Sequence, residues 1–211
     1  MNEDLKKSVN EIEFYMQSLG VIEACENIFK WLVPEIEKID AELSKKAGRP
    51  VVEYTRCRIK SAESIVNKLQ RKGREITYNC AIATLHDLAG IRVICSFQDD
   101  VYHMTRKIRK IKGLKIRKVK DYIAHPKSSG YRSIHMMIDI PFGEQTIGLE
   151  IQVRSAAMNY WATLEHQMSY KNKKESGKET DKIRKELKDC AIDIAEIDKR
   201  FLKLRKRIEK L

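Results

Sequence analysis

The sequence predicts an α+β fold in which a mixed sheet of about five strands is flanked by helices, with further helices at both ends of the chain. Two observations lead to this prediction. The middle of the chain interleaves β-branched or alternating segments with segments of helical spacing. Both ends carry apolar residues at helical spacing only. Because the chain has 211 residues, we expect one core, residues 48–170, with extensions at 1–47 and 171–211.

The N-terminal extension is expected to form two helices. The first ends near Gly20, and its apolar residues are Leu5, Val9, Ile12, Met16 and Leu19. The second has apolar residues three or four positions apart, at Ile22, Cys25, Phe29, Leu32, Ile36, Ile39 and Leu43. Pro34 lies inside this second pattern and predicts a bend or an interruption there, since proline lacks the backbone N–H that a helix uses.

The first part of the core alternates helices and strands. Helices are expected at 61–72, where Ser61 suits the N-cap position, at 79–87 and at 101–112. The β-branched run at 90–97 is typical of a central strand, and 114–123 is a more polar strand candidate. A loop follows at 125–130.

Two segments later in the core alternate between apolar and polar residues, at 131–140 and 147–154. The short connection through residues 141–143 indicates a hairpin. If both apolar faces cover one core, the polar faces coincide. One side of the sheet then displays Tyr131, His135, Glu150, Gln152 and Arg154. The last helix of the core is expected at 155–170 and carries Asn159.

The C-terminal extension repeats the helical spacing over almost its whole length. Its apolar residues are Ile183, Leu187, Cys190, Ile194, Ile197, Phe201, Leu204, Ile208 and Leu211. Such a stripe must be covered, and two alternatives stay open: packing on the first helices, or an interface between subunits.

The chain carries a formal charge of +12, distributed unevenly. Residues 1–47 sum to −4, residues 48–170 to +10 and residues 171–211 to +6. The surplus in the core indicates a polyanionic partner such as nucleic acid or nucleotide phosphates, although a solvated lysine-rich surface gives the same sum. There is no apolar run of 18 residues and no apolar N-terminal stretch, so we expect a cytoplasmic protein without a membrane span. The five scattered cysteines are expected to be reduced thiols.

Several polar residues of the core suit the handling of phosphate chains. Ser64 and Lys68 lie four apart on one face of the helix at 61–72, with Arg71 and Lys72 one turn further. Asp87 and Glu150 are isolated carboxylates among many cations, an arrangement that suits Mg²⁺ shared with phosphate oxygens. Phosphoryl transfer needs mainly such charge neutralisation and positioning. The sequence has no Walker loop, so side chains must hold any nucleotide.

Six short motifs occur in order along the core: Arg58-Ile59-Lys60-Ser61, Asp87-Leu88-Ala89-Gly90-Ile91-Arg92, Lys120-Asp121-Tyr122-Ile123, Gly130-Tyr131-Arg132-Ser133-Ile134-His135, Glu150-Ile151-Gln152-Val153-Arg154 and Asn159-Tyr160-Trp161-Ala162. This set resembles the synthetase domain of the RelA/SpoT homologues, specifically the stand-alone small alarmone synthetases. The resemblance covers roughly residues 48–170. The acidic first segment and the heptad-like tail resemble the flanking helices of those enzymes less specifically.

The resemblance implies a GTP pyrophosphokinase, which transfers the β,γ-diphosphate of ATP to the 3′-hydroxyl of GTP or GDP. The products are pppGpp or ppGpp and AMP, and the role is the stringent response. Asp87 and Glu150 are implied to hold Mg²⁺, with Glu150 a ligand or the base toward the 3′-hydroxyl. The implied ATP-binding residues are Arg58 and Arg92 on the adenine, and Lys60, Ser64, Lys68 and Arg71 on the phosphates. The implied acceptor residues are Tyr131 and Asn159 on guanine, Lys120, Lys127 and His135 on its ribose or phosphates, and Gln152 in the same pocket.

The resemblance also implies a homotetramer. Allosteric binding of (p)ppGpp is a property of tetrameric members, but residues 53–56 match them too loosely to assert it here. No hydrolase activity is expected. The His86-Asp87 pair is reminiscent of a metal-dependent phosphohydrolase, yet residues 1–85 contain no histidine to complete such a site.

Two other classes of function remain as alternatives. The first is a module that binds single-stranded RNA through the basic core and tail, as its main or its secondary activity. Aromatic residues make up only 7% of the chain, and only Tyr131 falls on the polar sheet face, which argues against RNA binding as the main function. The second is a nucleotidyltransferase of related fold, which releases pyrophosphate where a pyrophosphokinase releases AMP.

Overall fold

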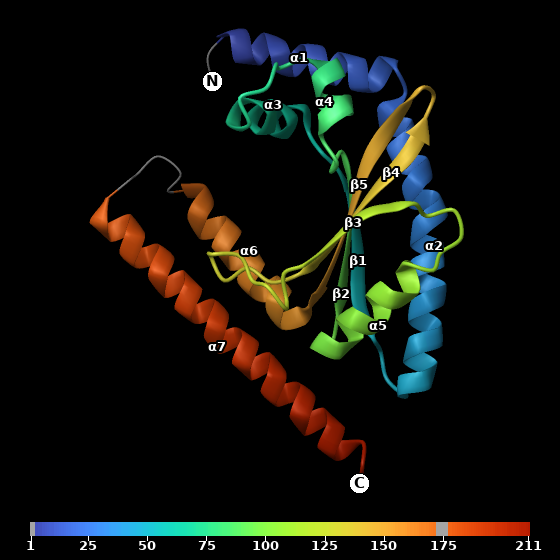
Figure 1. Ribbon diagram of the computed structural model, residues 1–211, viewed down its shortest axis with the longest axis vertical. Helices are drawn as coiled ribbons and strands as arrows, with labels where there is room; N and C mark the ends of the chain where they lie inside the picture. The colour runs from blue at the N-terminus through green and yellow to red at the C-terminus, as the bar shows by residue number, and fades with distance from the viewer. Residues whose placement is uncertain (1–2, 172–176) are drawn as a thin grey trace.

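The structure, a computed structural model, describes residues 3–171 and 177–211. Its elements follow the chain in the order α1 (Glu3–Ser18), α2 (Val21–Ala47), β1 (Val52–Ile59), α3 (Ala62–Arg71), α4 (Tyr78–Thr84), β2 (Ala89–Cys95), α5 (Gln98–Ile108), β3 (Ile116–Asp121), β4 (Ile134–Phe142), β5 (Gln145–Ser155), α6 (Ala156–Lys171) and α7 (Lys178–Ile208). Figure 1 shows the sheet edge-on, with α2 and α5 on one side and α6 and α7 on the other.

The five strands form one sheet in the order β1-β2-β5-β4-β3. Only β2 and β5 run parallel, and the other neighbours are antiparallel. This arrangement confirms the mixed sheet and the β4–β5 hairpin. The strand β1 was not predicted, because its burial does not alternate and it carries Arg56 and Arg58. It is an edge strand that pairs with β2 alone, so its residues need not follow a two-residue period.

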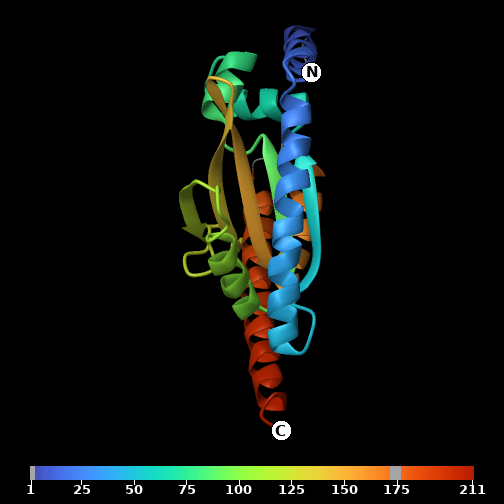
Figure 2. The same cartoon turned by 90° about the vertical axis from the view of Figure 1, so that its right-hand side faces the viewer.

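The main core lies between the sheet and the helices that precede β3, and α7 contributes to a separate, smaller cluster. Figure 2 shows α2 running along the length of the sheet. Buried residues of α1, α2, α3 and α5 join the apolar residues of the strands in one continuous cluster. The N-terminal helices therefore share the core of the sheet. Burial of their apolar stripes supplies the main driving force for this packing.

The helix α2 is continuous through Pro34, so the predicted interruption is wrong. Leu32 and Ile36 are fully buried on either side of the proline. Their packing against the core holds the chain in helical conformation where one backbone hydrogen bond is missing.

The helices α3 and α4 adjoin the connections that carry Lys60 and Asp87. Ser61 caps α3 as predicted, its hydroxyl accepting a hydrogen bond from the backbone N–H of Ser64 at 3.3 Å. The helix α4 ends at Thr84, three residues before the predicted limit. Asp87 consequently lies in the short connection between α4 and β2 rather than inside a helix.

The helix α7 packs mainly against α6 and α5 rather than against α1 and α2, which corrects the first alternative for the tail. Its buried residues are the small Ala191 and Ala195 together with Asp198. The hydroxyl of Ser155 donates a hydrogen bond to Asp198 at 2.6 Å. Most large apolar residues of the predicted stripe are exposed instead, while Leu187 and Ile194 are half-buried. The exposed residues are Ile183, Ile197, Phe201, Leu204, Ile208 and Leu211.

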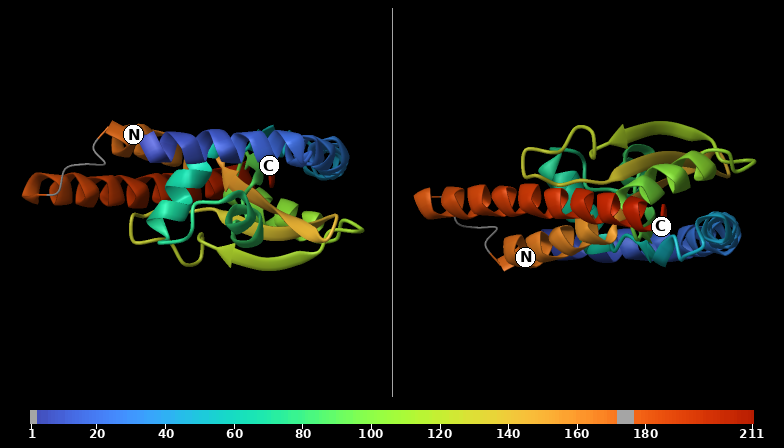
Figure 3. Two further views of the ribbon diagram at one scale, coloured as in Figure 1. Left: turned by 90° about the horizontal axis from the view of Figure 1, so that it is seen from above. Right: turned by 90° about the horizontal axis from the view of Figure 1, so that it is seen from below.

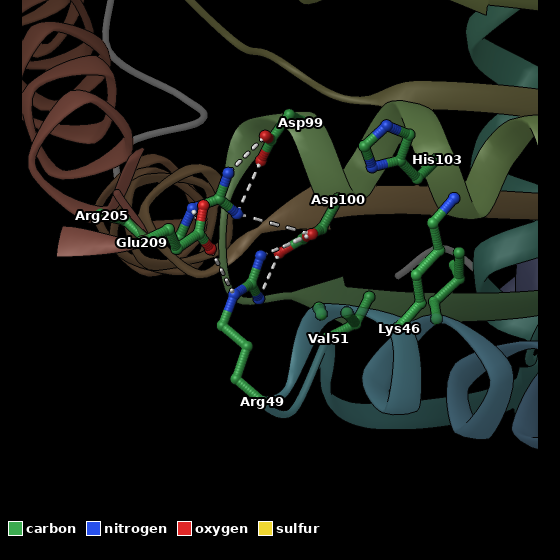
Figure 4. Close-up of a pocket in the computed structure, with 10 residues that line it drawn as sticks. Lys46, Arg49, Val51, Asp99, Asp100, His103, Arg205 and Glu209 are labelled. Atoms are coloured by element: carbon green, nitrogen blue, oxygen red, sulfur yellow. Dashed lines mark hydrogen bonds and ion pairs between the residues drawn. The ribbon is translucent and has the colours of Figure 1, made fainter. Parts of the chain in front are cut away.

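The C-terminal end of α7 is fixed to the start of α5 by charges (Figure 4). Arg205 forms a two-pronged pair with Asp99, the shorter contact being 2.6 Å. Arg49 pairs in the same way with Asp100, at 2.9 Å for both contacts. Both guanidinium groups also lie over the ring of Phe97, 4.8 and 4.9 Å from its centroid. These arginines line a cavity of about 500 Å³ whose charges are largely paired with one another.

Within the described ranges, no helix combines the length and the apolar character that crossing a membrane requires. All five cysteines are free thiols, as predicted.

Candidate active site

The parallel pairing of β2 with β5 brings the two predicted carboxylates to one end of the sheet. Gly90 lies opposite Glu150 in this register, and Asp87 comes three residues before Gly90. Both carboxylates line one open cavity of about 830 Å³. Both also line a smaller, adjoining cavity of about 180 Å³.

A glycine on β5 permits the close approach of the segment that carries Asp87. A Cβ atom at Gly148 would lie 2.3 Å from the Cα of His86 and 2.5 Å from the carbonyl oxygen of Leu85. No side chain fits at such distances. The connection between α4 and β2 therefore passes directly over the backbone of β5.

Asp87 is held by two lysines. Lys60 and Lys68 both donate to its Oδ2 atom, at 3.0 and 2.6 Å. Burial alone would raise the pKa of Asp87, but the two ammonium groups outweigh burial and lower that pKa. The other oxygen, Oδ1, is buried and has no hydrogen-bond partner among the residues that the structure describes. Asp87 therefore lines the cavity with one carboxylate oxygen that has no hydrogen-bond partner among these residues.

Glu150 is held by its neighbours on the same sheet face. Its Oε1 lies 2.8 Å from His135 Nδ1, and its Oε2 accepts a hydrogen bond from Gln152 at 2.5 Å. Burial opposes ionisation of this carboxylate, yet the hydrogen bonds and the charge of its partners lower its pKa to about 2. Burial also lowers the pKa of His135, so at neutral pH the imidazole is neutral beside an ionised Glu150.

A chain of hydrogen bonds extends from Glu150 across the sheet face. The hydroxyl of Tyr131 lies 2.7 Å from His135 Nε2, and Arg154 donates to that hydroxyl at 2.6 Å. Because Arg154 can only donate, the Tyr131 hydroxyl donates its proton to Nε2, and Nδ1–H then points to Glu150. Arg154 also donates to Gln152 at 2.8 Å. The predicted gathering of these five residues on one face is confirmed.

The wall of the larger cavity is strongly basic. Besides the carboxylates of Asp87, Glu150 and Glu165, its lining includes the cationic residues Arg58, Lys68, Arg71, Lys72, Arg117, Lys118, Lys120 and Lys127. The ammonium of Lys127 lies over the rings of Tyr131 and Tyr122, 4.6 and 4.8 Å from their centroids. Such a lining attracts polyphosphates, since many cations converge on one open space.

The smaller cavity lies between two arginines of neighbouring strands. Arg58 of β1 is paired with Gly90 of β2, and Arg56 with Arg92. Arg58 and Arg92 both line this cavity. Since Gly90 has no side chain, the stem of Arg58 packs against the backbone, 3.5 Å from where a Cβ atom would be. Two planar guanidinium groups at one opening suit a flat aromatic ligand.

Most of the predicted site residues come together, and three do not line either cavity: Lys60, Ser64 and Asn159. Lys60 acts through Asp87. Ser64 lies in the first turn of α3, where Ser61 donates a hydrogen bond to its hydroxyl at 2.9 Å. Asn159 lies on α6 and donates to the hydroxyl of Tyr54 at 2.8 Å.

Sequence reasoning missed several residues of the larger cavity. Tyr122 lies in one of the six motifs, and its ring meets that of His135 edge-on at 5.1 Å, so a signal for it existed. Arg117 and Lys118 belong to β3 and gave no such signal, because polar residues on an outer strand are ordinary. Lys72 was expected beside Arg71 at the end of the basic helix, and it lines this cavity.

The comparisons with known proteins agree with this geometry. A family model described as a region found in RelA / SpoT proteins matches residues 57–175. The GTP pyrophosphokinase YwaC of Bacillus subtilis (strain 168) is 40% identical over 175 residues, which cover 81% of this chain and 82% of that protein.

Two solved structures are also similar. A GTP pyrophosphokinase family protein from Streptococcus pneumoniae has a TM-score of 0.70 and 30% identity, covering 100% of this chain and 97% of the other. The small alarmone synthetase 1 of Bacillus subtilis, bound to its product pppGpp, has a TM-score of 0.67 and 26% identity, covering 87% and 97%. The chain therefore belongs to the RelA/SpoT family and shares the fold of its small alarmone synthetases.

Proposed function

We propose that the protein is a GTP pyrophosphokinase, which transfers the β,γ-diphosphate of ATP to the 3′-hydroxyl of GTP or GDP and releases AMP. One observation carries the proposal: Asp87 and Glu150 line the same cation-rich cavity, at the junction of the two parallel strands. A pair of carboxylates surrounded by phosphate-binding cations is what diphosphate transfer requires. The names of similar proteins point to the same reaction.

The donor half of the site is assigned to β1, β2 and α3. Arg58 and Arg92 are proposed to stack on adenine in the smaller cavity, which they already line. Lys68 and Arg71 are proposed to hold the ATP phosphates, with Lys72 beside them in the same lining. Lys60 donates a hydrogen bond to Asp87, and Ser64 is proposed to reach the phosphates from the first turn of α3.

The acceptor half is assigned to the face of β4 and to the loop before it. Tyr131 is proposed to stack on guanine, which requires Lys127 to leave the ring over which it lies. The freed ammonium, with Lys120 and His135, then contacts the phosphates or the ribose of the acceptor. Gln152 lies in the same lining. Asn159 is proposed to read the guanine edge once its amide is released from Tyr54.

The residues present fit a bound Mg²⁺. The buried Asp87 Oδ1 atom has no hydrogen-bond partner within the described residues, as expected of an oxygen that binds a cation. No group of three or more histidine, cysteine or acidic side chains that could hold a metal occurs in the described part of the chain. Mg²⁺ does not need one, because it takes one or two carboxylates and completes its shell with phosphate oxygens and water. When bound, it neutralises the charge of the phosphates.

Glu150 is the residue best placed to assist the acceptor hydroxyl. Its carboxylate is ionised and oriented by His135 and Gln152, so it can accept a hydrogen bond from a 3′-hydroxyl in the cavity. Asp87 is tied to two lysines through its other oxygen and is proposed as the firmer metal ligand.

We further propose a homotetramer. The exposed apolar residues on α7 form a stripe that a subunit interface would cover.

The test is the analysis of nucleotides by ion exchange after incubation of the purified protein with ATP, GTP and Mg²⁺. We expect pppGpp and AMP in equal amounts, and no product when EDTA replaces Mg²⁺. Release of pyrophosphate would indicate a nucleotidyltransferase instead. Absence of any 3′-diphosphorylated guanosine would reject the proposal.

A further inference from the structure

The loop that leads into β4 rests directly on α7. Gly130 of this loop has a φ of 90°, in the left-handed region that favours glycine. A Cβ atom built there would lie 2.5 Å from the Cβ of Ala191 and 3.4 Å from the carbonyl oxygen of Lys188. Loop and helix therefore meet where one residue has no side chain and the other only a methyl group.

Tyr131 continues this contact into the acceptor half of the site. Its ring is half-buried and packs against a small cluster made by Trp161, Ala162 and Ala191, with Ile194 beside it. The indole N–H of Trp161 donates to the carbonyl oxygen of Leu187 at 2.9 Å, which joins α6 to α7. The hydroxyl of Tyr131 enters the hydrogen-bond chain to His135 and Glu150. One side chain thus contacts α7 with its ring and the reaction centre with its hydroxyl.

The core fixes α7 in this place. Asp198 is buried and accepts the hydrogen bond of Ser155, the last residue of β5. Arg205 pairs with Asp99 at the start of α5 (Figure 4). Figure 3 shows α7 between α6 and the segment that connects β3 to β4. These two contacts lie C-terminal to Ala191, and the hydrogen bond from Trp161 to Leu187 lies on the N-terminal side, so the helix is held on both sides of its contact with Gly130.

We propose that α7 is part of the acceptor-nucleotide site, and that Ala191 is a positioning residue which, through Gly130, holds Tyr131 in place. The inference rests on the proposed function and deepens it. The family model ends at residue 175, before α7 begins, so that match gives no role to this helix. A displacement of about 1 Å in a substrate-holding group is enough to weaken binding and rate strongly.

The first test replaces Ala191 with leucine. The added carbon atoms must push the loop or the helix aside, because the space between them is already filled. We expect the KM for GTP to rise about tenfold or more. The KM for ATP and the affinity for a non-hydrolysable ATP analogue should change less than about twofold, since the donor residues lie on other elements. A general loss of folding would affect both nucleotides alike.

The matched control is Glu196→Leu. Glu196 lies five residues further along the same helix, is exposed and is not part of the apolar stripe, so the same side chain is added away from the loop. Its KM for GTP should stay within about twofold of the unchanged protein. An equal rise in Glu196→Leu and Ala191→Leu would overturn the proposal, because the effect would then come from the helix as a whole.

A compensating pair keeps the proposal testable if Ala191→Leu fails to fold. Gly130→Ala introduces the colliding methyl group, and Ala191→Gly removes the group it collides with. Gly130→Ala alone should raise the KM for GTP, and the double variant should recover part of the loss. Both carry the same backbone strain at residue 130, so their difference isolates the contact. No recovery would contradict the inference.

The two proposals fail in different ways. An unchanged protein that makes no pppGpp rejects the proposed function. An active protein in which Ala191→Leu folds and binds GTP normally rejects only the role of α7.

Discussion

His135 Nδ1 lies 2.8 Å from Glu150 Oε1, and Nε2 of the same ring accepts a hydrogen bond from the hydroxyl of Tyr131. The neutral imidazole thus joins the aromatic residue of the acceptor half to the carboxylate of the reaction centre. It can do so only in one protonation state, because a protonated ring has no acceptor nitrogen. The acceptor half of the site therefore depends on pH.

The stability of the protein should fall as the solution becomes acidic. Burial lowers the pKa of His135 below 6.5, and the pKa of Glu150 falls from 4.5 to about 2 despite burial. Both groups have a lower pKa in the folded than in the unfolded state, so the unfolded chain binds more protons. The free energy of unfolding therefore decreases as pH falls. The loss begins below about pH 6.5 with His135 and continues through the range between 4.5 and about 2 with Glu150.

Thermal unfolding between pH 7.5 and 5 measures the first of these effects. His135→Gln keeps a polar side chain but does not titrate, so its melting temperature should fall less over this range than that of the unchanged protein. Parallel curves would show that His135 is not the group responsible.

Glu150→Gln should abolish most of the transfer without unfolding the chain. The amide keeps an oxygen for the His135 N–H but loses the charge that a metal and an acceptor hydroxyl need. We expect a fall in kcat of roughly 10²–10⁴, measured by pppGpp formation, with a melting temperature close to that of the unchanged protein. Glu144→Gln is the matched control, since Glu144 is exposed in the β4–β5 turn. Full activity in Glu150→Gln would show that Glu150 is not required for transfer.

Arg205→Ala should loosen the C-terminal end of α7. The variant leaves Asp99 without its two-pronged partner and removes one guanidinium from the ring of Phe97. Charge-assisted pairs of this kind contribute about 1–3 kcal/mol to the free energy of unfolding. Hydrogen exchange should increase in the last turns of α7. Arg207→Ala, an exposed arginine two residues away, should leave exchange and stability unchanged. Equal effects of the two variants would contradict the anchoring role.

Phe201→Asp should reduce the mass of the assembly. Phe201 is 58% exposed on α7, in line with the exposed Ile197, Leu204 and Ile208. A charge inside an apolar interface is costly, so the variant should separate subunits that the stripe holds together. Light scattering at micromolar concentration measures the mass. Lys203→Asp serves as the control, because Lys203 lies outside that stripe. A monomer already in the unchanged protein would reject the tetramer.

The sequence predicted those parts of the fold in which the residue pattern of a single segment determines its structure. The alternation along β4 and β5 determines which side chains share a face of the sheet. The five hydrogen-bonded side chains that include Tyr131, Glu150 and Arg154 were therefore predictable. The edge strand β1 was not, because pairing with β2 alone holds it and its residues show no period. The continuity of α2 through Pro34 depends on packing against the sheet, which local propensity does not express.

The packing of α7 also could not be predicted from its own residue pattern. The apolar stripe of α7 was recognised, but the chain buries mainly the neighbouring small residues Ala191 and Ala195 for its own packing. Contacts made by a methyl group or a hydrogen atom, as between Ala191 and Gly130, carry almost no signal in hydrophobic periodicity. Contacts of this kind depend on how the loop and the helix pack in three dimensions.

The absence of a side chain at Gly148 has a consequence for the chemistry. The backbone of His86 rests where a methyl group at position 148 would have to be, and the next residue is Asp87. Any larger residue there would lift this crossing chain from the strand and part the two acids, while leaving every reactive group in the sequence intact. A position with no functional group of its own thus decides whether the functional groups meet.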